Sequence, residues 1–295
     1  MNPEVEKKHL GLAYQRNVRL ACQSKVNSAV CISEFNSEVQ ERIKFELISN
    51  VRITESIHEL SLIAKPCDFT FKSGQHIGVV IPIEGSDEIV RSYSILNSFA
   101  EYADSKGLKL NIRLHRHRTV GEPGLETPTD VSITGKGSSY LCSLQAGSKI
   151  EILPPFGTMS FDAIPEQDHF ILLAGGVGIV PMISLLDESL RNDDSRKFEL
   201  FYGVREASDA CHKDRLEKFA AEMQNFSYQV CPSKDKTSGA RQLTHYLENK
   251  YSQQNNELQN AVFLVCGPPS MVSAVQIYLQ ERGVSKSRIQ TDSFD

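Results

Sequence analysis

Hydrophobic and polar residues alternate over much of the first half of the chain. The pattern is clearest in LKLNIRLHRH, residues 108–117, and KIEIL at residues 149–153 repeats it. An earlier set of apolar residues also lies among polar ones, mostly at even spacing: Val51, Ile53, Ile57, Leu60 and Leu62. Such alternation, interrupted by Gly, Pro, Asp and Ser, is typical of short antiparallel strands. We therefore predict an antiparallel β-barrel between residues 41 and 161.

After residue 165 the pattern changes to apolar runs that alternate with amphipathic stretches. The strand-like runs are HFILLA, FELFYG, FSYQV, AVFLVC and RIQTDSF, and the helix-like stretches are MISLLDESL, DRLEKFAAEM, RQLTHYLENK and PSMVSAVQIYLQER. Strands that alternate with helices are typical of a parallel α/β sheet. The predicted fold class is therefore an all-β barrel over 41–163 followed by an α/β domain over 164–295, with a short segment over 1–40 in front.

The junction run FILLAGGVGIVPMISLL, residues 170–186, allows a membrane helix, a buried helix, or a strand that turns into a helix. A membrane helix needs roughly 20 consecutive apolar residues, and the glycines and Pro181 inside this shorter run disfavour one. FILLA suits a buried strand, GGVG a turn, and Pro181 the first turn of a helix. The N–H groups at such a helix start can bind a phosphate, although a plain tight turn has the same pattern.

The composition of the chain limits its possible partners and its cellular location. The 295 residues include 32 Lys+Arg and 37 Asp+Glu, a formal net charge of -5, which gives no support for nucleic-acid binding. The N-terminal residues lack the apolar core of a signal peptide, and we expect no membrane insertion. The 7 cysteines, an odd number without paired spacing, indicate reduced thiols. We therefore expect a cytoplasmic protein.

Several loops of unusual composition occur in a fixed order. RSYS and GKGSSYL lie in the barrel half, and AGGVGIVP, YGVRE, CGPPSM and the terminal TDSFD lie in the α/β half. The glycine turn and CGPPSM both follow strands, at the sheet edge where open α/β sheets bind ligands. These elements in this order resemble the ferredoxin-NADP reductase superfamily, and more narrowly the flavin-containing reductase components that feed oxygenases. The resemblance covers residues 41–295.

The resemblance implies a flavin site built from RSYS and GKGSS, with FAD as the flavin. Tyr93 is expected to lie against the isoalloxazine, and Ser94 to place its hydroxyl near N5, the atom that accepts hydride. Arg91 is expected to pair with the flavin pyrophosphate through its planar, permanently charged fork. The remaining cofactor-binding residues implied here are Ser92, Gly135, Lys136, Gly137 and Ser138.

The resemblance also implies a nicotinamide-cofactor site. Gly176, Gly178 and Pro181 match the family's turn for the pyrophosphate, which differs from the GxGxxG fingerprint because Pro181 occupies its last position. In CGPPSM, Cys266, Gly267 and Pro268 are expected to meet the nicotinamide ring, although a free cysteine is commonly a small buried apolar residue. Near the end of the chain, Phe294 is expected to cover the flavin. Asp292 lies near the place where the family often has an acidic residue, although TDSFD departs from the commoner ending.

Two features of the sequence contain possible metal ligands, but neither forms a complete metal site. VRLACQSKVNSAVCI, residues 18–32, resembles the end of a plant-type ferredoxin domain, with Cys22 as the last cluster ligand. No cysteine precedes Cys22, and Cys31 does not complete the set, so we expect a truncated remnant and no complete 2Fe–2S cluster. His115 and His117 lack further ligands at suitable spacing. The segment 118–134 is longer than usual in the family and is interpreted as an insertion.

The function implied by the resemblance is that of a flavoprotein reductase. Hydride passes from NADH or NADPH to FAD, and single electrons then pass to a ferredoxin or oxygenase component. The alternatives are a stand-alone NAD(P)H oxidase, diaphorase or ferric reductase, and a non-catalytic regulatory subunit that binds flavin or nucleotide. Arg205, Glu206 and Asp209 are candidates for contact with the 2′ position of the ribose, where a carboxylate favours NADH and an arginine favours NADPH. The resemblance to oxygenase reductases favours NADH, and Arg205 is the main argument against it.

Overall fold

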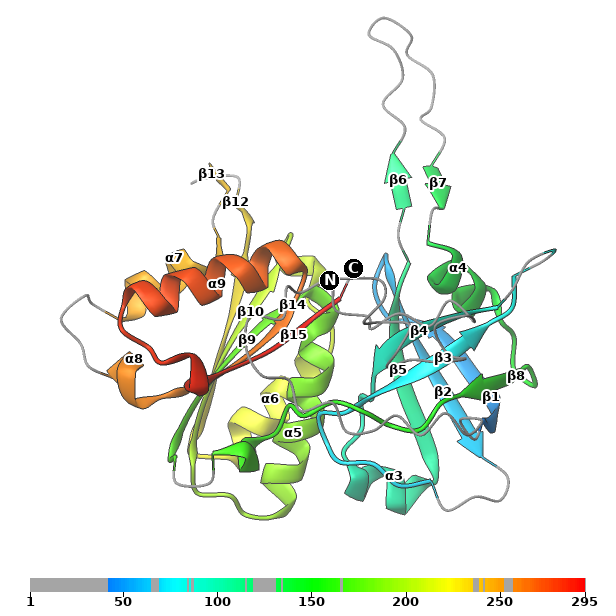
Figure 1. Cartoon of the computed structure of the whole chain (residues 1–295), viewed down its shortest axis with the longest axis horizontal. Coiled ribbons are helices and arrows are strands. Elements are labelled where there is room, and N and C mark those ends of the chain that lie inside the picture. The colour runs from blue at the N-terminus through cyan, green and yellow to red at the C-terminus, as the bar shows by residue number, and fades with distance from the viewer. Residues whose placement is uncertain are drawn as a thin grey trace, which may run out of the picture.

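The computed structural model describes residues 42–64, 69–83, 85, 88–114, 116–118, 131–133, 135–164, 167–235, 239–240, 242–251 and 257–294. Two sheets of different kind lie side by side in this part of the chain (Figure 1). The predicted ferredoxin remnant with Cys22 and Cys31, and also His115, lie outside the described residues.

The first sheet is antiparallel and bends into a nearly closed barrel. Its strands are β1 (Ile43–Arg52), β2 (Ile57–Ala64), β3 (His76–Ile81), β4 (Ile89–Ser94), β5 (Gly107–Arg113) and β8 (Lys149–Ile152). Their order is β4-β3-β8-β1-β2-β5. A bridge between Ile95, just after β4, and Leu110 in β5 brings the two edges together. The predicted antiparallel barrel is therefore confirmed.

The alternating pattern places the apolar side chains inside the barrel. Leu60 and Leu62 of β2 and Leu108 and Leu110 of β5 are completely buried. Val51 is 54% exposed, because a register shift between Leu47 and Ser49 interrupts the alternation along β1. Two helices accompany the barrel, α3 (Phe99–Ser105) and α4 (Lys136–Ser143).

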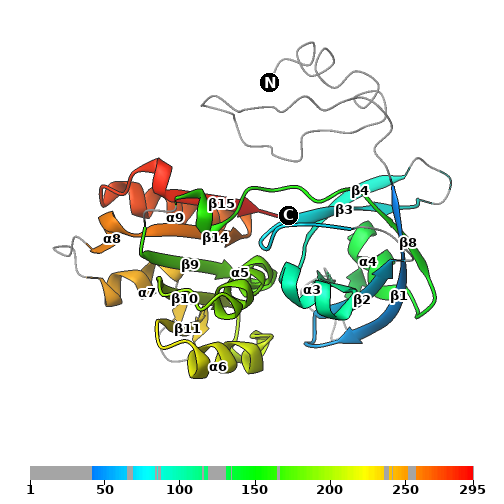
Figure 2. The ribbon, with the colours of Figure 1, turned by 90° about the horizontal axis from the view of Figure 1, so that it is seen from below.

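The second sheet is parallel and is covered by helices on both faces. Its strands are β9 (His169–Gly175), β10 (Lys197–Val204), β11 (Phe226–Pro232), β14 (Val262–Gly267) and β15 (Ile289–Ser293), in the order β11-β10-β9-β14-β15 (Figure 2). Helices α5 (Ile179–Arg191) and α6 (Lys213–Glu222) cover one face, and α7 (Leu243–Lys250) and α9 (Pro269–Glu281) cover the other (Figure 1). The short α8 (Glu257–Asn260) precedes β14. The predicted alternation of strands and helices is confirmed.

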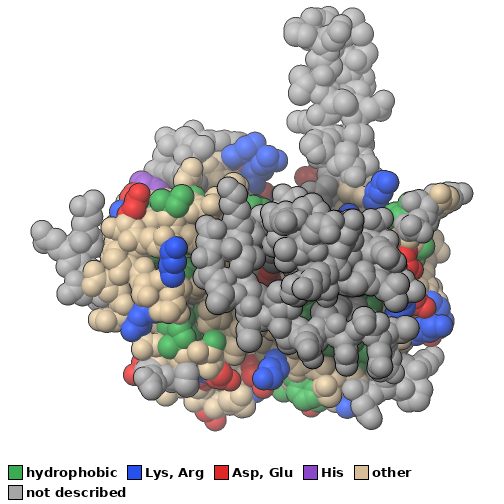
Figure 3. Space-filling model, in the orientation of Figure 1, with side chains coloured by type: hydrophobic (Ala, Val, Ile, Leu, Met, Phe, Trp, Pro, Cys, Tyr) green, Lys and Arg blue, Asp and Glu red, His purple; other side chains and the backbone are tan. Residues whose placement is uncertain are grey.

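The remaining elements are short. β6 (Arg116–Arg118) pairs with β7 (Val131–Ile133) at the two ends of the predicted insertion, and β12 (Lys234–Asp235) pairs with β13 (Gly239–Ala240). Within the described ranges, none of the helices has both the length and the apolar character needed to cross a membrane. On the face seen in Figure 3, basic and acidic side chains are interspersed over the described surface.

Candidate functional site

The predicted flavin residues come together where α4 begins against β4. Lys136 is the first residue of α4, and Gly135 is its N-cap. A Cβ atom added to Gly137 would lie 3.0 Å from Arg91 Cγ and 3.2 Å from Tyr93 Oη, so the helix start packs closely on β4. The first N–H groups of a helix have no acceptor within the helix. We call Arg91 and these N–H groups the cradle, and it is the predicted site of the FAD pyrophosphate.

The side chains around this cradle differ in exposure. Arg91, Ser92 and Lys136 are exposed, whereas Tyr93 is partly buried. Burial raises the pKa of Tyr93 to about 12, so the phenol is neutral at physiological pH and keeps its hydroxyl proton. Ser138 is buried, and its hydroxyl donates to the Gly135 carbonyl at 3.2 Å. The cofactor roles of these residues stay predictions.

Ser94, at the end of β4, lies opposite His76 in the antiparallel pair with β3. The His76 ring packs edge-on against Phe156, with 4.1 Å between ring centroids. Gly157 has φ +108°, and a Cβ there would lie 2.8 Å from the ring, so glycine is required at this contact. His76 is not among the residues predicted from the sequence, because nothing in GQHIG distinguishes it from an ordinary strand residue.

The nicotinamide turn and CGPPSM pack directly against each other. Gly176 has φ +56°, a left-handed conformation that favours glycine. A Cβ on Gly178 would overlap the Cys266 carbonyl oxygen, which by itself accounts for a glycine at this position. Gly175 and Gly267 both lie against the Met271 thioether. Pro181, in the first turn of α5, is buried.

Cys266 and Phe294 both lie next to Gly267, at the end of β14. Cys266 is completely buried, and burial together with the nearby Asp292 charge raises the pKa of its thiol well above the usual value. It is therefore a neutral thiol, packed in the core of the α/β domain. The backbone N–H of Phe294 donates to the Gly267 carbonyl at 3.3 Å, and its ring packs against the same core. Their roles toward the nicotinamide stay predictions.

A cleft of about 1100 Å³ opens between the two domains. Its walls include Gly175, Gly176 and Pro268 from the α/β domain and Ser56 and Ile57 from the barrel. Its volume slightly exceeds the range of about 300–1,000 Å³ that is usual for small-molecule sites. The cleft therefore has the place and the size for a dinucleotide that reaches from the glycine turn toward the barrel.

The cleft is lined by charged side chains of both signs. Arg205 lines it together with Glu206 and Asp209, and their contact with the coenzyme stays a prediction. The Glu206 backbone N–H donates to Asp209 Oδ2 at 3.0 Å, so that carboxylate is already engaged. Two further cations that were not predicted, Arg113 and Lys234, also line the cleft. Arg113 Nη1 lies 3.1 Å from the position of a Cβ on Gly176, directly beneath the glycine turn.

The two halves of the chain match separate family models. Residues 44–161 match the oxidoreductase FAD-binding domain, and residues 172–276 match the oxidoreductase NAD-binding domain. These matches cover most of the barrel, with its cradle, and the parallel sheet from β9 to β14, with its glycine turn.

The sequence is similar to curated proteins named as the F subunit of the Na(+)-translocating NADH-quinone reductase. The protein from Serratia proteamaculans is 30% identical over 312 residues, which covers 94% of this chain and 74% of that protein. The protein from Idiomarina loihiensis is 32% identical over 216 residues, which covers 70% of this chain and 49% of that protein. The chain thus spans about half the length of the latter.

Solved structures share the fold at low sequence identity. A ferredoxin-NADP+ reductase from Plasmodium falciparum matches with a TM-score of 0.68 at 19% identity, covering 86% of this chain and 96% of that one. A ferredoxin NADP+ reductase from Neisseria gonorrhoeae, solved with bound FAD and NADP, matches with a TM-score of 0.67 at 20% identity, covering 87% of this chain and 99% of that one.

Proposed function

Because this chain belongs to the ferredoxin-NADP reductase superfamily of FAD- and NAD(P)H-dependent oxidoreductases, we propose that it is a reductase that serves an acceptor held by a partner protein. FAD, when bound, supplies the step between two-electron hydride transfer and one-electron release. The chain's own residues would hold the two cofactors next to each other.

The observation that supports this proposal most directly is the meeting of both sets of site residues at one place. His76 lies opposite Ser94 on the barrel side and within 3.6 Å of Asp292 on the α/β side. Asp292 is in turn the strand partner of Cys266. A hydride donor on the glycine turn and a flavin on β4 would therefore face each other across this contact.

We assign Arg91 and the start of α4 to the flavin pyrophosphate, Tyr93 to the flavin ring, and Ser94 to the neighbourhood of N5. The cleft at Gly176 would hold the nicotinamide coenzyme, with Arg113 beneath its pyrophosphate. Phe294, at the Gly267 carbonyl, would cover the flavin until the coenzyme arrives. The predicted domain limits, 41–163 and 164–295, divide the chain between these two tasks.

The acceptor is the less specified part of the proposal. The relatives are named as components of an NADH-quinone reductase, which supports electron transfer inside a larger assembly and favours NADH as the donor. A ferredoxin or an oxygenase component remains the acceptor that the sequence motifs predict. An acceptor screen with an oxidised ferredoxin, a short-chain ubiquinone and ferricyanide separates these from a diaphorase, which would reduce only the small acceptors.

The absorption spectrum of the purified protein tests the proposal. FAD-reconstituted protein is recorded without oxygen before and after one equivalent of NADH, and a fresh sample is treated with NADPH. Rapid bleaching of the flavin bands by NADH is the expected result. A protein that stays colourless after FAD is supplied would contradict the flavin assignment and would favour a regulatory subunit.

A further inference from the structure

Helix α5 carries a polar stripe on the face that meets the barrel. Ser184, Asp187, Glu188 and Arg191 follow the spacing of one helix face. Ser184 and Asp187 are nevertheless buried, at 0% and 6% exposure. Buried polar groups are retained only where they find partners, and here each of the two has a partner in the barrel domain.

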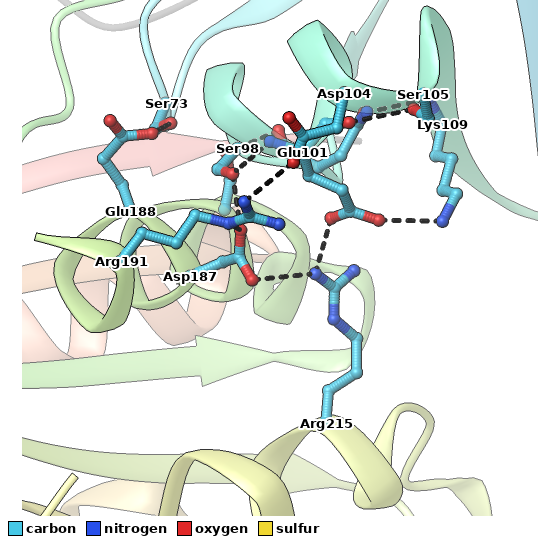
Figure 4. A network of polar contacts seen from close by, with 12 residues as sticks. Ser73, Ser98, Glu101, Asp104, Ser105, Lys109, Asp187, Glu188, Arg191 and Arg215 are labelled. Carbon is cyan, nitrogen blue, oxygen red and sulfur yellow. Dashed lines mark hydrogen bonds and ion pairs between the residues drawn. The ribbon is translucent and has the colours of Figure 1, made fainter. Parts of the chain in front are cut away.

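Three members of the stripe contact loops of the barrel domain, and Figure 4 labels two of them, Asp187 and Glu188, with their partners Ser98 and Ser73. Ser184 Oγ donates to the Asn97 carbonyl at 2.9 Å. Ser98 Oγ donates to the Asp187 carboxylate at 2.5 Å. Ser73 Oγ, on the loop before β3, donates to Glu188 at 3.0 Å.

Ser98 has a second task at the same time. It is the N-cap of α3, and its hydroxyl oxygen accepts the Glu101 N–H at 3.0 Å. The hydroxyl therefore joins the start of α3 to Asp187 through one buried atom. Arg191 adds a contact to Asp187 at 3.0 Å and another to Asp104 in α3 at 3.0 Å.

Helix α6 makes a second link to α3. Arg215 lies 2.7 Å from Glu101 and 3.7 Å from Asp187. Lys109 in β5 lies 2.8 Å from the other oxygen of Glu101. Although burial opposes it, Lys109 and Arg215 together hold the pKa of Glu101 below its usual value. The network thus consists mainly of charged side chains, and Glu101 and Asp187 each have partners in both domains (Figure 4).

The position of this network in the chain gives it a consequence for the site. Ser98 follows Ser94 by four residues, and α5 begins directly at the glycine turn. We propose that the polar stripe of α5 is a strut that sets the distance and angle between the glycine turn and β4, with Asp187 as its central positioning residue. This inference rests on the proposed function, in which these two elements carry the hydride donor and its acceptor.

The test compares Asp187→Asn with Asp193→Asn. The first keeps the shape of a buried carboxylate without its charge, and the second makes the same exchange at an exposed position just after α5. A displacement of about 1 Å between reacting groups costs on the order of 100-fold in rate. We therefore expect Asp187→Asn to slow stopped-flow reduction of FAD by NADH about 10- to 100-fold, with the Kd for NADH changed less than about twofold.

Two further readouts separate positioning from general damage. The charge-transfer absorbance between reduced nicotinamide and flavin should weaken in Asp187→Asn and persist in Asp193→Asn. In the cofactor-free protein, hydrogen exchange over residues 97–105 and 179–191 should be faster in Asp187→Asn only. Unchanged exchange, or reduction of FAD at the wild-type rate, would overturn the strut.

Ser98 supplies an independent pair of variants should Asp187→Asn fail to fold. Ser98→Ala removes the shared hydroxyl, and Ser98→Thr keeps it. Alanine should slow FAD reduction and threonine should restore it; equal rates in the two variants would contradict the inference. If neither NADH nor NADPH reduces the wild-type flavin, the proposed function is wrong. Hydrogen exchange over residues 97–105 and 179–191 then tests by itself whether Asp187 holds α5 against the barrel.

Discussion

His76 Nδ1 in β3 lies 3.6 Å from Asp292 Oδ2 in β15. This distance allows an ion pair when the imidazole is protonated. Because His76 is the strand partner of Ser94 and Asp292 is the strand partner of Cys266, the pair connects the start of β3 in the barrel with the carboxyl end of the parallel sheet. Two titratable groups thus lie where the predicted flavin and nicotinamide residues meet.

The first prediction concerns the pKa of His76. Burial lowers this pKa, and the charge of Asp292 raises it. Asp292→Asn removes the raising charge, so the pKa of His76 should fall further. Titration of the imidazole by nitrogen-15 NMR measures it directly. Asp162→Asn, at an exposed position, is the control, and a His76 pKa that stays constant or rises in Asp292→Asn would refute the pairing.

The second prediction concerns stability at mildly acidic pH. His212 Nε2 lies 2.7 Å from Asn111 Nδ2, so the neutral imidazole accepts from the amide. Burial, followed by the charge of Arg215, lowers the pKa of His212 to about 4. The unfolded chain then binds the proton that the folded chain excludes, so stability falls as pH drops from about 6.5 to about 4, on the order of 2–3 kcal/mol.

His212→Gln keeps an acceptor for Asn111 and removes the titration. Its free energy of unfolding should therefore depend less on pH between about 6.5 and 4 than that of the wild type. Urea unfolding at a series of pH values measures the difference. His245→Gln in α7 is the matched control. A His212 variant with the wild-type slope would show that the imidazole is not the titrating group.

The third prediction concerns the contact between the glycine turn and β14. Because a Cβ on Gly178 would overlap the Cys266 carbonyl oxygen, Gly178→Ala must shift backbone and should cost about 3 kcal/mol of stability. Gly107→Ala is the control, since a Cβ there meets nothing closer than 3.6 Å. It should cost less than about 1 kcal/mol. Chemical denaturation of both variants checks the contrast, and similar stabilities would contradict the packing.

Much of the fold could be predicted from the sequence, because each half has one dominant period. Alternation over β5 and the buried runs of β9 and β14 reflect burial of one or both sheet faces. The pairing across the barrel could not be predicted in this way. Whether His76 lies opposite Ser94 depends on strand register, which local pattern does not determine.

The same limit applies to the candidate site. Arg113 is one of the polar positions in the alternation of β5, and only the fold shows that the glycine turn of the other domain lies over it. Asp187 lies in the amphipathic helix α5, and its role depends on the contact with Ser98, which is distant in the sequence. The roles of such residues can be inferred only from a structure that contains both domains.

The fourth prediction concerns FAD binding. Arg91 is exposed beside the start of α4, where its charge would meet the flavin pyrophosphate. Charged hydrogen bonds contribute about 1.5–3 kcal/mol, so Arg91→Gln should weaken FAD binding roughly 10- to 100-fold. Quenching of flavin fluorescence gives the Kd. Arg52→Gln, an exposed position on β1, should leave it unchanged, and equal Kd values for both variants would remove Arg91 from the site.

The fifth prediction concerns the choice of coenzyme. Arg205 and Lys234 both line the cleft, and the Lys234 N–H donates to the Arg205 carbonyl at 2.9 Å, so the backbones that carry the two cations lie next to each other. If NADH is the donor, no 2′-phosphate needs them. Arg205→Gln should then change kcat/KM for NADH by less than about twofold, with the exposed Lys213→Gln as control. A wild type that prefers NADPH, together with a selective loss of NADPH turnover in Arg205→Gln, would show that Arg205 binds the 2′-phosphate and that the donor is NADPH.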